Sequence, residues 1–219
     1  MTRLSALLVL AAPLACHHAK STTTPESTGA TPPPPVAGGD GAAGLDAELV
    51  AIAAKPGAAI KFKLRVDGSG AIVKQALYHS DAASIPAEVR SKAEQRWPGG
   101  TIVRYETELY ADHGRVHEVD VTTAEGARCE IAIKADGAVL YEECQLAADA
   151  LPAPVAAKVA ALYPQGKVLE AETKRGEEVD ELTIEIESGG QQFYLRIEPD
   201  GTVLGKLLRI PGVFEVPID

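Results

Sequence analysis

The sequence predicts an α+β fold, in which tandem α-β4 repeats form a continuous antiparallel sheet with helices packed on one face. Three observations lead to this prediction. A unit of about 60 residues occurs twice, each copy opens with an amphipathic helix, and each continues into segments in which apolar and polar side chains alternate. The shared landmarks are a Pro-Ala opening, an aromatic-Pro-x-Gly turn and an Asp-Gly hairpin, at residues 85–89, 97–100 and 135–140 in the first copy and 151–155, 163–166 and 199–204 in the second.

The first 43 residues are expected to lie outside the folded part. Residues 1–16 have the apolar run of a secretory signal peptide, which is too short to span a bilayer. The segment resembles a bacterial lipobox, in which Cys16 receives lipid after cleavage; the alternative is ordinary cleavage near Ala15. Residues 17–43 are rich in Pro, Thr and Gly and predict a disordered linker. We therefore expect a protein of the periplasm or cell surface, lipid-anchored to the bacterial outer membrane.

The composition restricts the partners. The formal net charge is -10, whereas a nucleic-acid-binding protein needs a basic face that neutralises phosphates. The charge also argues against binding to anionic lipid, so the N-terminal lipid is the only membrane contact that we expect. No nucleophile elbow, phosphate-binding loop, zinc-protease motif or dinucleotide fingerprint occurs in the sequence. We accordingly expect no enzymatic activity and no cofactor.

Residues 45–80 precede the first full copy. Residues 45–54 are a short helix candidate, and apolar side chains at 60, 62, 64 and 66 alternate with basic ones at 61, 63 and 65, which is the period of a half-buried strand. A turn at 67–70 returns the chain as the second arm of a hairpin. This segment is either a truncated third copy or a flanking extension that adds strands to the sheet.

The two full copies span residues 84–146 and 150–210, followed by a tail at 211–219. Ser84 is a candidate N-cap for the first helix. Apolar side chains four residues apart form one stripe on each helix, which ends at Trp97 in the first copy and at Tyr163 in the second; we interpret both aromatics as core anchors. Four strands are expected after each helix.

These strands have one apolar and one polar face. In the second copy, the residues at 182, 184 and 186 are apolar, and those at 181, 183, 185 and 187 are polar. An antiparallel sheet with helices on one side and the other side free to solvent accounts for this pattern. Asp-Gly at 136–137 and 200–201 predicts two-residue hairpins of type I′. The acidic side chains between 170 and 187 are read as a solvated face, and His113 and His117 as an exposed loop and strand edge, since no third zinc ligand is identifiable.

Cys129 and Cys144 form the sharpest local signal. If the hairpin at 136–137 has two residues in its turn, the two cysteines lie directly opposite each other on neighbouring strands. An oxidising compartment then favours a disulfide. The alternative is that both are small core residues, because the matching positions in the second copy are Phe193 and Leu208.

Each copy has a helix that ends in aromatic-Pro-x-Gly and strands that close on an Asp-Gly hairpin, and the two copies follow a secretion signal. This arrangement resembles the PepSY-like family, which is related in fold to the β-lactamase inhibitory protein. The resemblance covers residues 84–146 and 150–210. It implies a non-enzymatic extracytoplasmic module whose concave sheet presents a binding face, and some members are thought to restrain peptidases or other secreted enzymes. No family site residue carries over. The longer first hairpin, at 111–115, and the N-terminal extension depart from the pattern.

The function expected from these observations is a non-catalytic, lipid-anchored module that binds an envelope or secreted protein, with inhibition of a secreted peptidase or another envelope enzyme as its specific form. Aromatic side chains among charges on the polar face are typical of a protein-binding surface. The candidate binding face therefore consists of Tyr141, Glu185, Tyr194 and Arg196. The alternatives are an extracytoplasmic sensor or binding protein for a small ligand or metal ion, and a structural role in envelope assembly.

Overall fold

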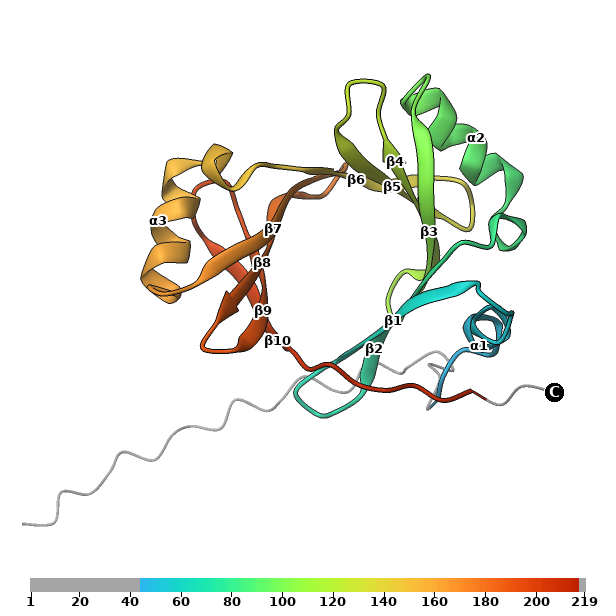
Figure 1. Cartoon of the computed structure of the whole chain (residues 1–219), viewed down its shortest axis with the longest axis horizontal. Helices are drawn as coiled ribbons and strands as arrows, with labels where there is room; N and C mark the ends of the chain where they lie inside the picture. The colour runs from blue at the N-terminus through green and yellow to red at the C-terminus, as the bar shows by residue number, and fades with distance from the viewer. Residues whose placement is uncertain (1–43, 217–219) are drawn as a thin grey trace, which may run out of the picture. The chain divides into compact units, whose positions relative to one another are not determined.

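The computed structural model describes residues 44–216, so the expected signal peptide, Cys16, the linker and the last three residues lie outside the described part. One sheet of ten strands dominates it, and hydrogen bonds join each strand to its neighbour in chain order (Figure 1). The helices are α1 (Ala47–Ala53), α2 (Ala87–Arg96) and α3 (Ala153–Leu162). The strands are β1 (Ala59–Val66), β2 (Ile72–His79), β3 (Thr101–Tyr110), β4 (Gly114–Thr122), β5 (Arg128–Lys134), β6 (Val139–Gln145), β7 (Lys167–Arg175), β8 (Asp180–Ser188), β9 (Gln191–Ile197) and β10 (Val203–Arg209).

The order of these elements confirms the predicted fold class. α2 is followed by β3 to β6, and α3 by β7 to β10, so the α-β4 pattern occurs twice in one antiparallel sheet. The segment before the first repeat adds α1, β1 and β2 to the same sheet. None of the helices within residues 44–216 is long and apolar enough to cross a bilayer.

The core lies between the helices and one side of the sheet, which we call the outer face. Val89 and Ala93 of α2 pack against β3, β4 and β5, and Val155 of α3 packs against β7, β8 and β9 in the equivalent cluster. Trp97 and Tyr163 pack at the margins of these two clusters, as predicted for core anchors. Burial of an apolar stripe on each helix therefore holds both repeats together.

The glycine that ends each aromatic-Pro-x-Gly turn is required by close packing. A methyl group on Gly100 would lie 2.6 Å from Val121 Cγ1, and one on Gly166 would lie 2.9 Å from Ile186 Cγ2. The chain leaves each helix pressed against the sheet, so a larger residue would push the first strand of the repeat away. This contact explains why the motif recurs at the same place in both copies.

The predicted N-cap is wrong. Pro86 precedes α2 and makes no side-chain cap, whereas Ser84 closes a 3₁₀ turn, and its hydroxyl donates to Asp81 Oδ2 at 2.5 Å. Asp81 caps this turn by accepting from the Ala83 backbone N–H. Ser84 thus lies two residues before the N-cap position of the helix.

The predicted turn type is also wrong. Lys134 N–H donates to Ala138 O and Gly137 N–H donates to Lys134 O, which defines a three-residue loop. Type I′ needs a positive φ at both central residues, and here Gly137 alone has one, at 86°. The hairpin at Gly201 has the same pattern.

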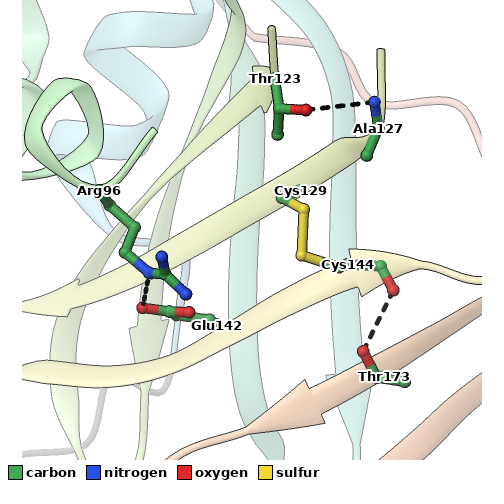
Figure 2. Close-up of a disulfide and its surroundings, with 7 residues drawn as sticks. All are labelled: Arg96, Thr123, Ala127, Cys129, Glu142, Cys144 and Thr173. Atoms are coloured by element: carbon green, nitrogen blue, oxygen red, sulfur yellow. Dashed lines mark hydrogen bonds and ion pairs between the residues drawn. A yellow bond between two sulfur atoms is a disulfide. The ribbon is translucent and has the colours of Figure 1, made fainter. Parts of the chain in front are cut away.

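The disulfide between Cys129 and Cys144 is nevertheless confirmed (Figure 2). The two cysteines are paired residues of β5 and β6. The longer turn changes the register by one residue, and an irregularity beside Ala132 and Ile133 changes it back before Cys129 is reached. The two deviations offset each other, which is why the predicted pairing holds.

The sheet curls away from its helices, so that its other side, here called the inner face, turns toward itself (Figure 1). The Arg65 guanidinium of β1 lies 5.6 Å from the ring centre of Tyr194 on β9. The ring of Phe214, which follows β10, stacks on Phe62 of β1 at 4.7 Å. Within the described part of the chain, β1 and β10 each have one strand neighbour; we call these two free edges, with the residues 210–216 beside them, the seam.

Candidate functional site

The inner face carries charged and aromatic side chains from most strands, and the curl buries many of them. Glu108 is 0% exposed, and Glu106 and Glu118 are exposed by only 1% and 2%. The expectation that this face is free to solvent is therefore wrong. The alternation of polar residues was identified correctly, but curling places strands that are distant in sequence opposite one another.

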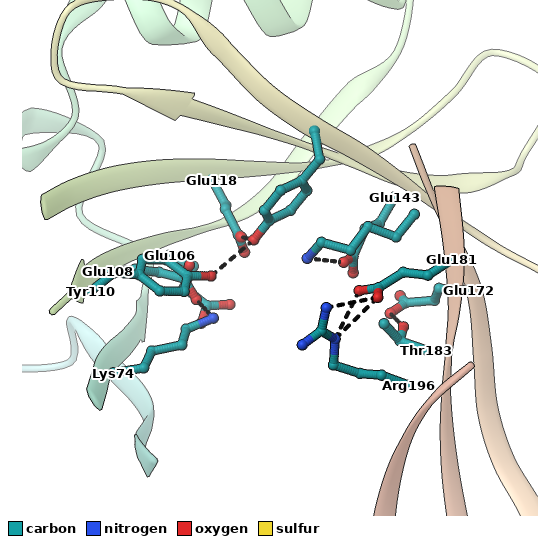
Figure 3. A network of polar contacts seen from close by, with 12 residues as sticks. Lys74, Glu106, Glu108, Tyr110, Glu118, Glu143, Glu172, Glu181, Thr183 and Arg196 are labelled. Atoms are coloured by element: carbon teal, nitrogen blue, oxygen red, sulfur yellow. Dashed lines mark hydrogen bonds and ion pairs between the residues drawn. The ribbon is translucent and has the colours of Figure 1, made fainter. Parts of the chain in front are cut away.

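Three carboxylates from β3 and β4 form the first group, Glu106, Glu108 and Glu118, whose oxygens lie within 4.8 Å of one another (Figure 3). The Lys74 ammonium of β2 contacts Glu108. Burial and the charge of Glu106 raise the pKa of Glu108 to about 7. Burial also opposes ionisation of Glu106, but the charges of Lys63 and Lys74 outweigh it and lower its pKa to about 2. The group therefore holds a proton close to neutral pH.

The second group consists of Glu130, Glu143 and Glu172, from β5, β6 and β7, again with oxygens within 4.8 Å of one another. Lys174 Nζ lies 2.5 Å from Glu143 Oε1. Burial, together with the negative charges of Glu143 and Glu170, raises the pKa of Glu172 to about 8. The Thr183 hydroxyl donates to Glu172 Oε2 at 3.4 Å.

An ion pair on β8 and β9 continues this network (Figure 3). The Arg196 guanidinium donates to both carboxylate oxygens of Glu181, at 2.8 to 3.1 Å. Glu181 is buried, whereas Arg196 keeps part of its side chain in solvent. Ion pairs on the inner face thus occur on strands from β2 to β9.

Tyr141 lies inside the network and not on a surface. It is 4% exposed, its hydroxyl donates to Glu118 and lies 3.2 Å from the Tyr110 hydroxyl, and the Lys174 ammonium lies 3.2 Å from its ring centre. The expectation that Tyr141 lies on a face open to solvent is therefore wrong, because β6 lies in the middle of the curled sheet.

The other three predicted residues gather near the seam. Glu185 of β8 is the direct strand partner of Tyr194, and Arg196 lies two residues further along β9. Arg209 of β10 pairs with Glu185, and its guanidinium lies 5.0 Å from the ring centre of Tyr194. All three predicted residues are partly exposed. Their contact with a partner stays a prediction.

The remaining polar predictions are only partly correct. Glu177 and Glu178 are exposed, as a solvated face requires, but Glu172 and Glu181 belong to the inner network. His117 is buried, 3.4 Å from the Thr107 hydroxyl, and burial lowers its pKa to about 4. The reading of His117 as an exposed strand edge is therefore wrong.

The two carboxylate groups were missed at the sequence level. Acidic side chains alternate on the polar face of β3, at Glu106 and Glu108, and of β4, at Glu118 and Asp120, which is a visible signal. Their convergence depends on register between strands, and no single strand contains that information. Carboxylate oxygens are the ligands that Ca²⁺ and Mg²⁺ prefer, and carboxyls with a pKa near 7 to 8 exchange protons at neutral pH. Both kinds of chemistry are open to the groups.

Three of the solved structures that are similar to this chain are of Bacteroides proteins. A BLIP-like protein from Bacteroides fragilis has 19% identity and a TM-score of 0.45, with 58% of this chain and 89% of that chain covered. A DUF2874 family protein from Bacteroides uniformis has 14% identity and a TM-score of 0.46, with 57% and 89% covered. A DUF2874 family protein from Bacteroides ovatus has 14% identity and a TM-score of 0.45, with 56% and 86% covered.

No protein-family model matches the sequence, and no curated protein matches it. The chain is structurally similar to BLIP-like and DUF2874 proteins of Bacteroides.

Proposed function

We propose that this chain is a non-catalytic protein-binding module of the cell envelope, and that it binds its partner at the seam. One observation supports this most directly. Large apolar side chains are exposed on the two strands with free edges and just after β10. They are Ile60, Leu64, Val66, Leu204, Leu208, Ile210, Val213 and Phe214. Exposed apolar side chains gathered in one region of a protein surface mark interaction sites.

The specific form of the proposal is a lipid-anchored protein, attached through Cys16, that inhibits a secreted peptidase or another envelope enzyme. The sequence features behind it are the signal peptide and the resemblance to the PepSY-like family. The Cys129–Cys144 disulfide is in keeping with an oxidising compartment. Glu185, Tyr194 and Arg196 lie near the seam and belong to the proposed contact surface.

The test is affinity capture of the full chain from the envelope of its own cell, read by mass spectrometry. A seam variant, Leu64→Ser with Leu208→Ser, is compared with a matched control, Val103→Ser with Leu169→Ser, which removes two exposed apolar side chains elsewhere. We expect the seam variant to lose a partner that the wild type and the control retain. Capture that is unchanged in the seam variant, or lost equally in the control, would overturn the proposal.

The second candidate function is that of a sensor for a metal ion, and the observation that favours it is the convergence of two carboxylate groups. Thermal unfolding with and without millimolar Ca²⁺ or Mn²⁺ tests it. A rise in the unfolding temperature that Glu143→Gln removes supports it, and an unchanged temperature at pH 8 contradicts it.

A further inference from the structure

We propose that the free edge of β1 pairs with an extended acidic segment of a protein partner, which adds a strand to the sheet. This inference rests on the proposed function and specifies the chemistry of the segment that binds. Addition of a strand to an exposed sheet edge is a general mode of peptide recognition, in which backbone hydrogen bonds give affinity and alternate side chains give specificity.

The edge of β1 has two chemically different sides. Leu64 lies on the outer side of β1 together with Phe62. Ile60, which is 57% exposed, and Val66, which is 53% exposed, extend this apolar surface. Lys61, Lys63 and Arg65 alternate with them and face inward. Their register partners on β2 are Tyr78, Ala76 and Lys74. Because side chains alternate along a strand, a paired segment places one set beside the apolar residues and the other beside the basic ones.

The basic side of this edge is only partly compensated by nearby carboxylates, those of Glu106 and Glu185. Among the residues that the structure describes, neither Lys61 nor Arg65 forms an ion pair with a carboxylate, and Lys63 reaches Glu106 only at 3.7 Å. Burial lowers the pKa of Lys61, and the neighbouring charges of Lys63 and Arg209 lower it further. An acidic side chain placed beside β1 would relieve this repulsion between like charges.

A second copy of the chain does not fit the same edge. The other free edge, β10, carries Lys206 and Arg209, and β1 is itself basic. Pairing either edge of one copy with β1 of another would bring cations together, which is destabilising across a strand pair. Charge therefore favours a partner with an acidic, alternating segment.

The residues after β10 show how the apolar side can be occupied. The ring of Phe214 stacks on Phe62, with the two planes 6° apart. The neighbouring described residues, 210–216, form no strand and make no backbone hydrogen bond to β1. An apolar side chain from an extended segment thus already lies on the outer side of β1, while the backbone edge is still open.

The test measures binding of synthetic peptides to the full chain by isothermal titration calorimetry. The probe alternates Glu and Val over about the length of β1, and its control alternates Lys and Val. Two further probes carry N-methyl groups on all Glu or on all Val residues. In a strand, alternate N–H groups point to opposite edges, so strand pairing requires one methylated form to lose binding and the other to retain it.

We expect the Glu-Val peptide to bind at least about tenfold more tightly than the Lys-Val peptide, and more weakly as salt increases. Lys61→Glu with Arg65→Glu should weaken its binding by about tenfold, because two favourable charge contacts become repulsive. Lys158→Glu with Lys167→Glu, which makes the same change of charge at exposed positions elsewhere, should leave binding unchanged. Thermal unfolding of each variant confirms that it is folded.

Two results would overturn the inference: equal binding of both methylated forms, or no preference for the acidic peptide. Its failure is distinguishable from failure of the proposed function. If the seam variant loses its envelope partner but the Glu-Val peptide does not bind, the protein-binding module stands and strand pairing at β1 is rejected. If no envelope partner depends on the seam, the proposed function itself fails.

Discussion

The carboxyl of Glu172 should make this protein less stable as the pH rises. Burial and neighbouring charges raise its pKa in the folded chain to about 8, against an ordinary value of 4.5. The folded state therefore binds the proton more tightly than the unfolded state. The stability that this proton gives to the folded state is fully present below pH 4.5 and is lost as the pH rises through 8.

The magnitude follows from the shift of the pKa. Since one pKa unit corresponds to about 1.4 kcal/mol, this carboxyl should remove about 3 kcal/mol from the free energy of unfolding between pH 5.5 and pH 8.5. Glu172→Gln keeps the size of the side chain and an acceptor for the Thr183 hydroxyl, but it does not titrate. The variant should lose about 3 kcal/mol less than the wild type over this interval.

The assay is urea denaturation at both pH values, with the wild type, Glu172→Gln and the exposed control Glu178→Gln measured side by side. His117 acts in the opposite direction, because burial lowers its pKa to about 4 and its contribution is lost as the pH falls through 6.5 toward 4. Comparison of variant with wild type cancels this effect. If Glu172→Gln has the same pH dependence as the wild type and the control, the carboxyl is ionised throughout and the argument from burial is refuted.

Three further predictions concern packing, the disulfide and the inner ion pair, and all are measured as the free energy of unfolding. Gly166→Ala should cost about 1–3 kcal/mol, because the added methyl group would lie 2.7 Å from the Cβ atom of the preceding aromatic residue; Gly68→Ala, which has open space around it, should change it by less than about 0.5 kcal/mol. Cys129→Ser with Cys144→Ser should cost about 3 kcal/mol, since the bond closes a loop with a sequence separation of 15, and reduction of the wild type should give the same loss. Arg196→Met should cost roughly 2 kcal/mol, because the buried carboxylate of Glu181 loses its partner; an unchanged free energy of unfolding would contradict this explanation.

Some parts of the fold were predictable because they depend on local pattern. The alternation at 181–187 identified the apolar and polar sides of β8, and the stripe ending at Trp97 identified the buried side of α2. Ser84 was misassigned as a cap because the N-cap residue of α2 is Pro86, two residues later. The pairing of Cys129 with Cys144 was correct even though the turn was not, because an irregularity within the strands compensated for the longer loop.

The sequence by itself determined the tandem repeat, the class of fold, which side of each strand meets the helices, and the positions of the two cysteines that bond. These features depend on the period of side chains along a strand or helix, which is local. Only the tertiary structure decided what the polar side does. Curling of the sheet turned an expected open surface into a buried network around Glu108 and Glu172, and left β1 and β10 as free edges. Curvature accumulates from small twists between many strand pairs, so no single segment of the sequence encodes it.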